Sequence, residues 1–137
     1  MAIRVLLADD HRFILDGLEA LLSAEDGISV VATTEDGGTA VRLVKELKPD
    51  VVVIDLSMPG LDGIEATRQI KALHPTAQVV VLTGLADART ASRALDAGAM
   101  GYVSKDSATD ELPQAIRNVA SRKVFLSPRV AGNLLER

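Results

Sequence analysis

Apolar runs alternate with helix-like repeats along the chain. Five short apolar runs are predicted to form strands, over residues 3–8, 28–33, 51–55, 78–83 and 100–104. After each run, apolar residues recur at intervals of three or four, which predicts helices near residues 13–23, 40–47, 66–73, 86–97 and 112–119. A strand followed by a helix, five times over, predicts a parallel α/β sheet with helices on both faces. The third and fourth runs are apolar without alternation, as expected for strands covered on both sides.

A further helix is predicted beyond this repeat. Ser127 and Pro128 have the residue types of an N-cap and a first helical position, and Ala131, Leu134 and Leu135 follow as apolar residues. This segment either covers the domain as a lid or begins a connection to another part of the protein.

Length and composition indicate one globular domain. The 137 residues are 47 % hydrophobic and 25 % charged, which is ordinary for a globular protein. Cysteine is absent, so no disulfide is possible, which fits a reducing compartment. No apolar run approaches the roughly 18 residues of a membrane span, and no signal peptide is visible. The net charge of −4, without a basic cluster, disfavours nucleic-acid binding by this chain alone. We therefore expect a cytoplasmic protein that does not contact a membrane.

Acidic residues follow two of the predicted strands. Asp9 and Asp10 come directly after the first run, and Asp55 ends the third. Ligands of open parallel sheets bind outside the carboxyl ends of the strands, so the three carboxylates converge if these strands are neighbours. Two unit charges about 4 Å apart repel by roughly 4 kcal/mol at an effective dielectric near 20. A dication would relieve this repulsion, and oxygen ligands favour Mg²⁺, or alternatively Mn²⁺, over zinc.

Two other strand ends add a hydroxyl and an ammonium group. Thr83 ends the fourth run and is followed by a glycine, while Lys105 follows the fifth run. Acids, a dication, a hydroxyl and a lysine together predict a phosphoryl-transfer site, where the metal and Lys105 neutralise phosphoryl oxygens and Thr83 donates a hydrogen bond. A carboxylate can itself be the nucleophile and form an aspartyl phosphate. Asp55 is the candidate because its flanking acids can hold the metal.

The chain resembles the receiver domain of bacterial two-component response regulators over about residues 2–122. The resemblance is carried by Asp9-Asp10, Asp55-Leu-Ser-Met-Pro-Gly, Thr83-Gly84, Tyr102 and Lys105. It implies a flavodoxin-like (CheY-like) fold, a doubly wound five-stranded parallel sheet with strand order 2-1-3-4-5. That order comes from the family and not from the spacing of this chain. We assign residues 1–122 to the receiver domain and residues 123–137 to a connector.

The resemblance also implies roles for these residues. Asp55 would accept a phosphoryl group from the phosphohistidine of a histidine kinase. Mg²⁺ would be bound directly by Asp10, Asp55 and the backbone carbonyl of Ser57, and through water by Asp9. Thr83 and Tyr102 would be the switch pair, with Thr83 moving toward the phosphoryl group and Tyr102 turning inward behind it. The domain would promote its own phosphorylation and dephosphorylation and would not be an enzyme with a separate substrate.

Finer features resemble the subgroup with a LuxR-type helix-turn-helix output domain, of the NarL and FixJ kind. They are Asp10-His11, residues 101–106 and Leu126-Ser127-Pro128. In that subgroup a DNA-binding domain follows the connector, so DNA would be bound only through an output domain beyond these residues. A homodimer through the first, fourth or fifth helix is a further expected partner state. Many receivers have a cis Lys-Pro bond, whereas Asp106 after the lysine implies a trans bond.

Other interpretations of the same residues stay open. Asp9-Asp10, taken alone, would more often cap a helix than bind a metal. His11 could be a ligand or a phosphodonor, although we expect it to start the first helix. A metal-dependent phosphohydrolase is an alternative function, but such hydrolases generally carry a second Asp where this chain has Ser57. An interaction module with an inactive pocket is a third possibility, and the intact pocket residues argue against it.

Overall fold

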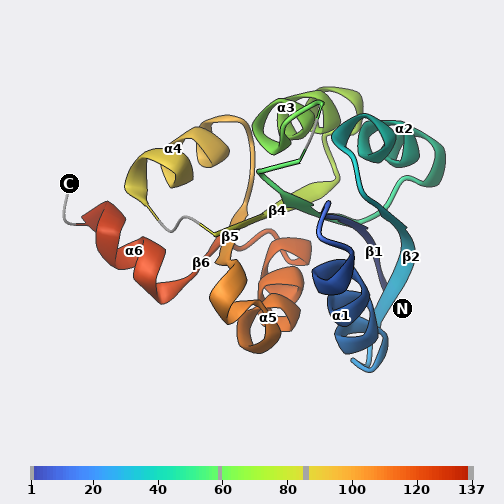
Figure 1. The fold of residues 1–137 in the computed structure, drawn as a ribbon, viewed down its shortest axis with the longest axis horizontal. Helices are drawn as coiled ribbons and strands as arrows, with labels where there is room; N and C mark the ends of the chain where they lie inside the picture. The colour runs from blue at the N-terminus through green and yellow to red at the C-terminus, as the bar shows by residue number, and fades with distance from the viewer. Residues whose placement is uncertain (1, 59, 85–86, 136–137) are drawn as a thin grey trace.

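In the computed structural model, which describes residues 2–58, 60–84 and 87–135, strands and helices alternate as the sequence predicts (Figure 1). The strands are β1 (Ile3–Ala8), β2 (Ile28–Thr34), β3 (Val51–Asp55), β4 (Gln78–Thr83), β5 (Gly101–Ser104) and β6 (Phe125–Leu126). The helices are α1 (Arg12–Ser23), α2 (Gly37–Leu47), α3 (Gly63–Leu73), α4 (Ala88–Asp96), α5 (Ala108–Ala120) and α6 (Pro128–Leu135). A short 3-10 helix, η1 (Lys105–Ser107), connects β5 to α5.

The sheet confirms the predicted strand order and adds one strand. The order is β2-β1-β3-β4-β5-β6, and every neighbouring pair is parallel. The prediction of five strands therefore omits β6, whose two residues pair with Gly101 and Tyr102 of β5. A two-residue strand has no periodicity of its own. It is fixed by pairing, because the Phe125 N–H donates to the Met100 carbonyl oxygen at 3.0 Å.

Helices cover both faces of the sheet, so two separate apolar cores form. In Figure 1, α2, α3 and α4 lie above the sheet, while α1 and α5 lie below it. The upper core joins residues such as Leu6, Ile54 and Ile70. The lower core joins residues such as Leu15 and Ile116. Because β3 and β4 are buried along their whole length, their unalternating apolar sequence is explained.

Aspartates begin the three helices of the upper layer. Asp36, Asp62 and Asp87 are the N-caps of α2, α3 and α4, and each side chain accepts a hydrogen bond from a backbone N–H three residues later. Helix α1 differs, because its N-cap is His11 and no side chain caps it. The acids next to His11 are therefore not used as helix caps.

Details at the helix ends depart from the sequence analysis. Leu73, expected on the apolar face of its helix, is the last residue of α3 and is 54 % exposed, because the helix turns it away from the core. Helix α4 begins at Ala88 rather than near residue 86. Pro59 and Ala86 lie outside the described residues, as do the side chains of Leu134 and Leu135. Among the described residues, no helix has the length and hydropathy to cross a membrane.

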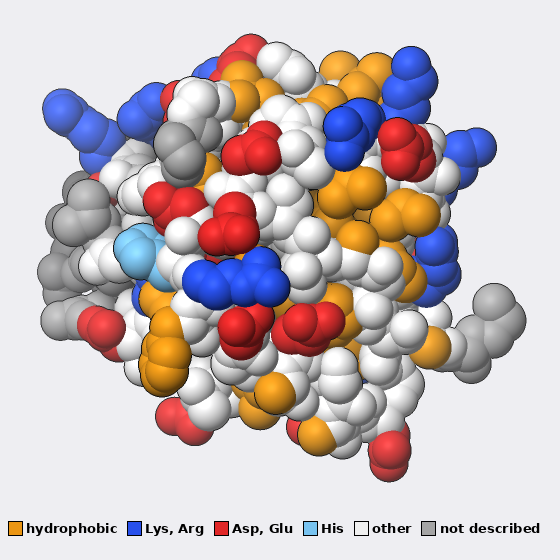
Figure 2. All heavy atoms as spheres, turned by 45° about the vertical axis from the view of Figure 1, so that its right-hand side comes forward, with side chains coloured by type: hydrophobic (Ala, Val, Ile, Leu, Met, Phe, Trp, Pro, Cys, Tyr) orange, Lys and Arg blue, Asp and Glu red, His pale blue; other side chains and the backbone are white. Residues whose placement is uncertain are grey.

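Acidic and basic side chains are interspersed on the surface. The face shown in Figure 2 carries Asp and Glu beside Lys and Arg, with apolar side chains scattered between them. This mixture agrees with the modest net charge of −4.

Candidate functional site

The pairing of β1 with β3 brings the predicted acids together. Ala8 lies beside Ile54 in this pairing, so Asp9 follows one strand next to Asp55 at the end of the other. Asp9 is 1 % exposed and Asp55 is fully buried, whereas the side chain of Asp10 is 29 % exposed. The condition for convergence, that these two strands are neighbours, is met.

Lys105 reaches the acids from β5. Its Nζ lies 2.9 Å from Oδ2 of Asp55 and 3.4 Å from Oδ2 of Asp9. The side chain is only 14 % exposed, so this ammonium group is largely committed to the acidic pocket, which we define as Asp9, Asp10, Asp55 and Lys105. The described residues contain no cis peptide bond, which confirms the expected trans bond between Lys105 and Asp106.

Backbone groups hold two of the carboxylates in place. The Ser57 N–H donates to Oδ1 of Asp55 at 3.1 Å, and the His11 N–H donates to Oδ1 of Asp9 at 2.8 Å. Each acid thus accepts a hydrogen bond from the residue two positions later. This geometry keeps both carboxylates turned into the pocket and sets Ser57 beside Asp55.

The pocket holds more negative charge than its lysine neutralises. Burial raises the pKa of Asp9 above its ordinary value, and the charge of Asp55 raises it further, while the His11 N–H and Lys105 oppose the rise. Oδ2 of Asp9 and Oδ1 of Asp10 are buried atoms without a hydrogen bond, although the former makes the ion pair with Lys105. Such atoms are costly unless a ligand satisfies them. The donor set therefore fits a hard dication.

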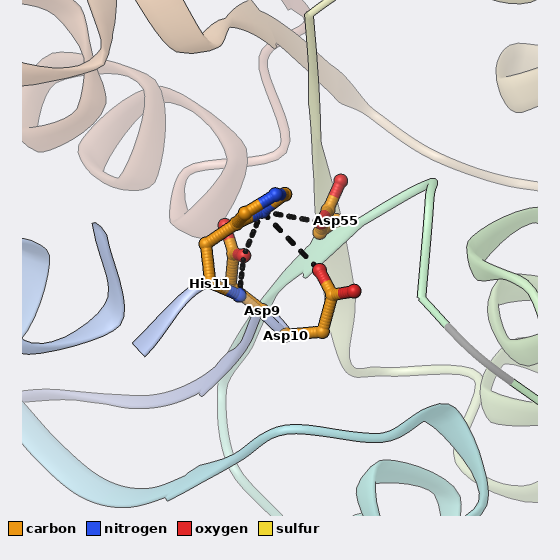
Figure 3. Close-up of side chains that lie close together, drawn as sticks. All are labelled: Asp9, Asp10, His11 and Asp55. Carbon is orange, nitrogen blue, oxygen red and sulfur yellow. Dashed lines mark hydrogen bonds and ion pairs between the residues drawn. The ribbon is translucent and has the colours of Figure 1, made fainter. Parts of the chain in front are cut away.

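His11 also lies at this pocket, where the sequence offers it only as an alternative ligand or phosphodonor. One ligand atom from each of Asp9, Asp10, His11 and Asp55 lies within 4.8 Å of the others (Figure 3). The imidazole Nδ1 is 3.2 Å from Oδ1 of Asp9, 3.2 Å from Oδ1 of Asp10 and 3.9 Å from Oδ2 of Asp55. His11 starts α1 as expected, and its ring also covers the acids.

Thr83 and Tyr102 lie next to each other behind the pocket. Both are buried on adjacent strands, Thr83 at the end of β4 and Tyr102 within β5, and their side chains share a hydrogen bond. Burial raises the pKa of Tyr102 to about 12, so the phenol stays protonated at any physiological pH. On its outer side, Thr83 lines a cavity of about 220 Å³ together with Ser57, Thr90 and Arg93. The predicted switch pair is thus connected through side chains.

A glycine allows the chain to turn tightly after Asp55. A Cβ atom at Gly63 would lie 2.5 Å from the Asp55 carbonyl oxygen and 2.7 Å from Cα of Leu56. Only glycine can therefore start α3 this close to the end of β3. This role of Gly63 cannot be predicted from the sequence, because the contact depends on how the loop between β3 and α3 returns to Asp55.

Ser127 links the connector to the strand that carries Tyr102. Its hydroxyl accepts a hydrogen bond from the Ser104 N–H at 3.1 Å and donates to Oε1 of Glu111 at 2.5 Å. We call these three residues the Ser127 bridge. The Ser127 N–H also donates to the Tyr102 carbonyl oxygen at 2.9 Å.

Helix α6 continues this contact along the upper core. Val130 is fully buried in the same apolar cluster as Tyr102 and the α4 residues Ala91 and Ala94. Helix α6 therefore packs on α4 and on β5, the strand that carries Tyr102. A cavity of about 410 Å³ is lined by Asp50, Ala2 and Gln78 among others, at the amino ends of the strands and away from the acids.

Comparison with known proteins identifies relatives over nearly the whole chain. The sequence model of the response regulator receiver domain family matches residues 5–117. The response regulator GacA of Pseudomonas viridiflava is 40 % identical over 132 residues, covering 96 % of this chain and 62 % of GacA. The transcriptional regulatory protein LiaR of Bacillus subtilis is 42 % identical over 135 residues, covering 98 % of this chain and 64 % of LiaR. The chain thus spans less than two thirds of these relatives.

A solved structure has the same arrangement. The crystal structure of a LuxR-family two-component response regulator from an Aurantimonas species superposes with a TM-score of 0.95 at 39 % sequence identity. The match covers 99 % of this chain and 97 % of that one. The likeness includes the connector, because it extends over almost all residues of both chains.

Proposed function

The chain belongs to the response regulator receiver domain family, and on that premise we propose that it is a switch operated by phosphorylation of Asp55. The phosphodonor would be the phosphohistidine of a histidine kinase. The observation that carries the proposal is the contact of the buried Asp55 carboxylate with Lys105 at 2.9 Å, beside two other acids. This arrangement combines a nucleophile with the charges that phosphoryl transfer needs.

The transfer step follows from this geometry. A carboxylate oxygen of Asp55 forms the bond to phosphorus, the phosphorus–nitrogen bond of the donor breaks, and its electron pair leaves with the imidazole. The Lys105 ammonium group stabilises the charge on the phosphoryl oxygens. Asp10, Asp55 and the Ser57 carbonyl would hold Mg²⁺, or Mn²⁺, directly, and Asp9 would hold it through water. When bound, the dication supplies further positive charge to the phosphoryl oxygens.

The response would pass through Thr83 and Tyr102. Thr83 is close enough to share a hydrogen bond with Tyr102, so its movement toward a phosphoryl group would change what the tyrosine packs against. Tyr102 contacts the connector through its carbonyl group and through the cluster that contains Val130. Moving such a switch from 1:99 to 99:1 needs about 5.5 kcal/mol of differential stabilisation. New bonds of the phosphoryl group to the metal, Thr83 and Lys105 would supply it.

The wider role rests on the relatives. We propose that residues 1–122 are the receiver domain and residues 123–137 the connector to an output domain that binds DNA. One relative is named a transcriptional regulatory protein, which supports control of transcription by the longer protein. A homodimer formed on phosphorylation and a cytoplasmic location are further parts of this proposal. Turnover of a separate substrate is not expected, because Ser57 stands where a phosphohydrolase would have a second acid.

Incubation with Mg²⁺ and acetyl phosphate, followed by intact mass measurement, tests the proposal. One phosphoryl group per chain is expected, and Asp55→Asn should abolish it. Asp16→Asn is the matched control, because Asp16 is an acid of 60 % exposure on α1. Repeated turnover of a small phosphate ester would instead favour the hydrolase, and no modification at all would favour the inactive interaction module.

A further inference from the structure

The ring of His11 lies over the acidic pocket, and its Nδ1 has neighbours that it cannot all contact favourably in one protonation state. Nδ1 is 3.1 Å from the Lys105 ammonium. It is also 3.2 Å from a carboxylate oxygen of each of Asp9 and Asp10 (Figure 3). A protonated Nδ1 can donate to a carboxylate but then faces the ammonium. An unprotonated Nδ1 can accept from Lys105, but its lone pair then faces two carboxylates.

A metal cation bound between Nδ1 and the carboxylates would make their close approach favourable. Ligands about 2.1 Å from a six-coordinate metal lie about 3.0 Å apart at adjacent corners of the octahedron. The separation of 3.2 Å between Nδ1 and Oδ1 of Asp10, a proposed direct ligand, is close to this value. The ring can move in to bind, because the His11 side chain is 56 % exposed.

Buried oxygen atoms point independently to a cation here. Asp9 is 1 % exposed, and its Oδ2 has no hydrogen bond. Oδ1 of Asp10, the atom 3.2 Å from Nδ1, is also a buried atom without one. Asp9 and Asp10 both belong to the group of four residues that can each offer a ligand atom within 4.8 Å of the others.

We propose that His11 is an additional metal ligand, which makes this a mixed nitrogen and oxygen site that prefers first-row transition dications to Mg²⁺. This inference rests on the metal site of the proposed function. Asp10, Asp55, the Ser57 carbonyl and His11 would fill four of about six positions, leaving two for water and a phosphoryl oxygen. Imidazole raises affinity for metals such as Ni²⁺ and Co²⁺ far more than for Mg²⁺, which prefers oxygen.

The test is calorimetric titration of the untagged protein with Ni²⁺ and, separately, Mg²⁺. In His11→Ala, the Ni²⁺ dissociation constant should rise about tenfold or more, the scale of losing a metal-site residue, while that for Mg²⁺ should change less than about threefold. His74→Ala is the matched control. It removes the other histidine of the chain, which is the C-cap of α3, and should change neither constant. Retained Mg²⁺ binding by His11→Ala shows that the variant is folded.

A second readout tests whether the ring itself coordinates the metal. With two histidines in the chain, the ring signals of ¹⁵N-histidine protein resolve by NMR, and the diamagnetic dication Zn²⁺ should strongly shift the Nδ1 signal of His11, as coordination does, but should leave the signals of His74 in place. An unchanged ratio of Ni²⁺ to Mg²⁺ affinity in His11→Ala, with Mg²⁺ still bound, would overturn the role of His11 alone. Two results would overturn the metal site itself. One is an affinity for dications that is unchanged in Asp55→Asn, and the other is a wild-type protein that binds no dication.

Discussion

The acidic pocket and the Ser127 bridge lie at the same edge of the sheet, but their polar atoms are paired to very different degrees. In the pocket, Lys105 pairs with two of the three acids, Asp9 and Asp55, and two buried oxygens lack a hydrogen bond. In the bridge, the buried Ser127 hydroxyl both accepts and donates a hydrogen bond. A buried polar group without a partner raises the free energy of the folded state, whereas a paired one does not.

This difference indicates that the acidic pocket is a ligand site, whereas the Ser127 bridge stabilises the fold. The pocket is stabilised by whatever adds positive charge to it. The bridge gains nothing from a ligand, and it fixes the connector to the strand that leads into Lys105. Changes in the pocket should therefore alter binding and reactivity, while changes in the bridge should alter stability.

The largest expected effect comes from removing the cation of the pocket. Lys105→Ala should slow phosphorylation by acetyl phosphate about 10²–10³-fold, as when one charge-stabilising group is removed from an active site. Affinity for Mg²⁺ should not fall, because the carboxylates lose a competing ammonium group. The rate is followed by intact mass, and Lys123→Ala, at an exposed position, is the control. A slow reaction with equally weakened Mg²⁺ binding would contradict the assigned role.

Breaking the bridge should destabilise the protein. Ser127→Ala leaves the buried Ser104 N–H without its acceptor, so the free energy of unfolding in urea should fall by about 2 kcal/mol. Ser107→Ala is the control, because Ser107 precedes α5 without capping it through its side chain. Phosphorylation of Asp55 should remain. Equal stability of the two variants would show that the bridge contributes nothing.

Removing one negative charge from the acidic pocket should raise the free energy of unfolding, in contrast to Ser127→Ala. Burial raises the pKa of Asp9 in the folded protein, so the folded state holds that proton more tightly than the unfolded state. Stability is therefore lost as the pH rises from the ordinary value of 3.8 through the raised pKa. Without a dication, Asp9→Asn should be more stable at pH 7 by about 1 kcal/mol, because Lys105 offsets part of the roughly 4 kcal/mol of a close charge pair.

The pH dependence and the metal dependence check that prediction. The stability difference between Asp9→Asn and the wild type should vanish below the ordinary pKa of aspartate. Excess Mg²⁺ should stabilise the wild type more than the variant, because the ligand binds only the folded state. A loss of stability in Asp9→Asn at neutral pH would mean that its ion pair with Lys105 outweighs the repulsion.

A similarly small effect is expected at Thr83 and Tyr102. Tyr102→Phe keeps the buried ring and removes the hydrogen bond with Thr83, so the free energy of unfolding should fall by only about 0.5–1.5 kcal/mol. Phosphorylation of Asp55 should be unchanged, whereas the accompanying change in the NMR spectrum of β5 and α6 should be reduced. An identical spectral response would exclude Tyr102 from signal transmission.

The sequence predicts the parts of the molecule that depend on local pattern. Each strand and helix of the five repeats has its own periodicity, and Asp9, Asp55 and Lys105 converge because parallel strands end at one edge. The missed features depend on long-range contact. Strand β6 needs β5 beside it, and Gly63 matters only where the loop returns to Asp55.

The position of His11 was out of reach for the same reason. Its Nδ1 lies 3.1 Å from Nζ of Lys105, a residue 94 positions away in the chain. The pair Asp10-His11 was already a feature of the resemblance, yet only the folded chain reveals that the ring covers the acids. The sequence therefore predicts which side chains at strand ends gather at one site, but it does not predict where a side chain in the following loop points.

Tyr102 has a practical consequence for following the protein in solution. It is the only tyrosine, and the chain has no tryptophan, so near-ultraviolet signals from a phenol arise from one site. That phenol is fully buried between Thr83 and the cluster that contains Val130. Near-ultraviolet absorbance or fluorescence of an unlabelled sample therefore reports on the interior between Thr83 and α6 while a metal or a phosphodonor is added.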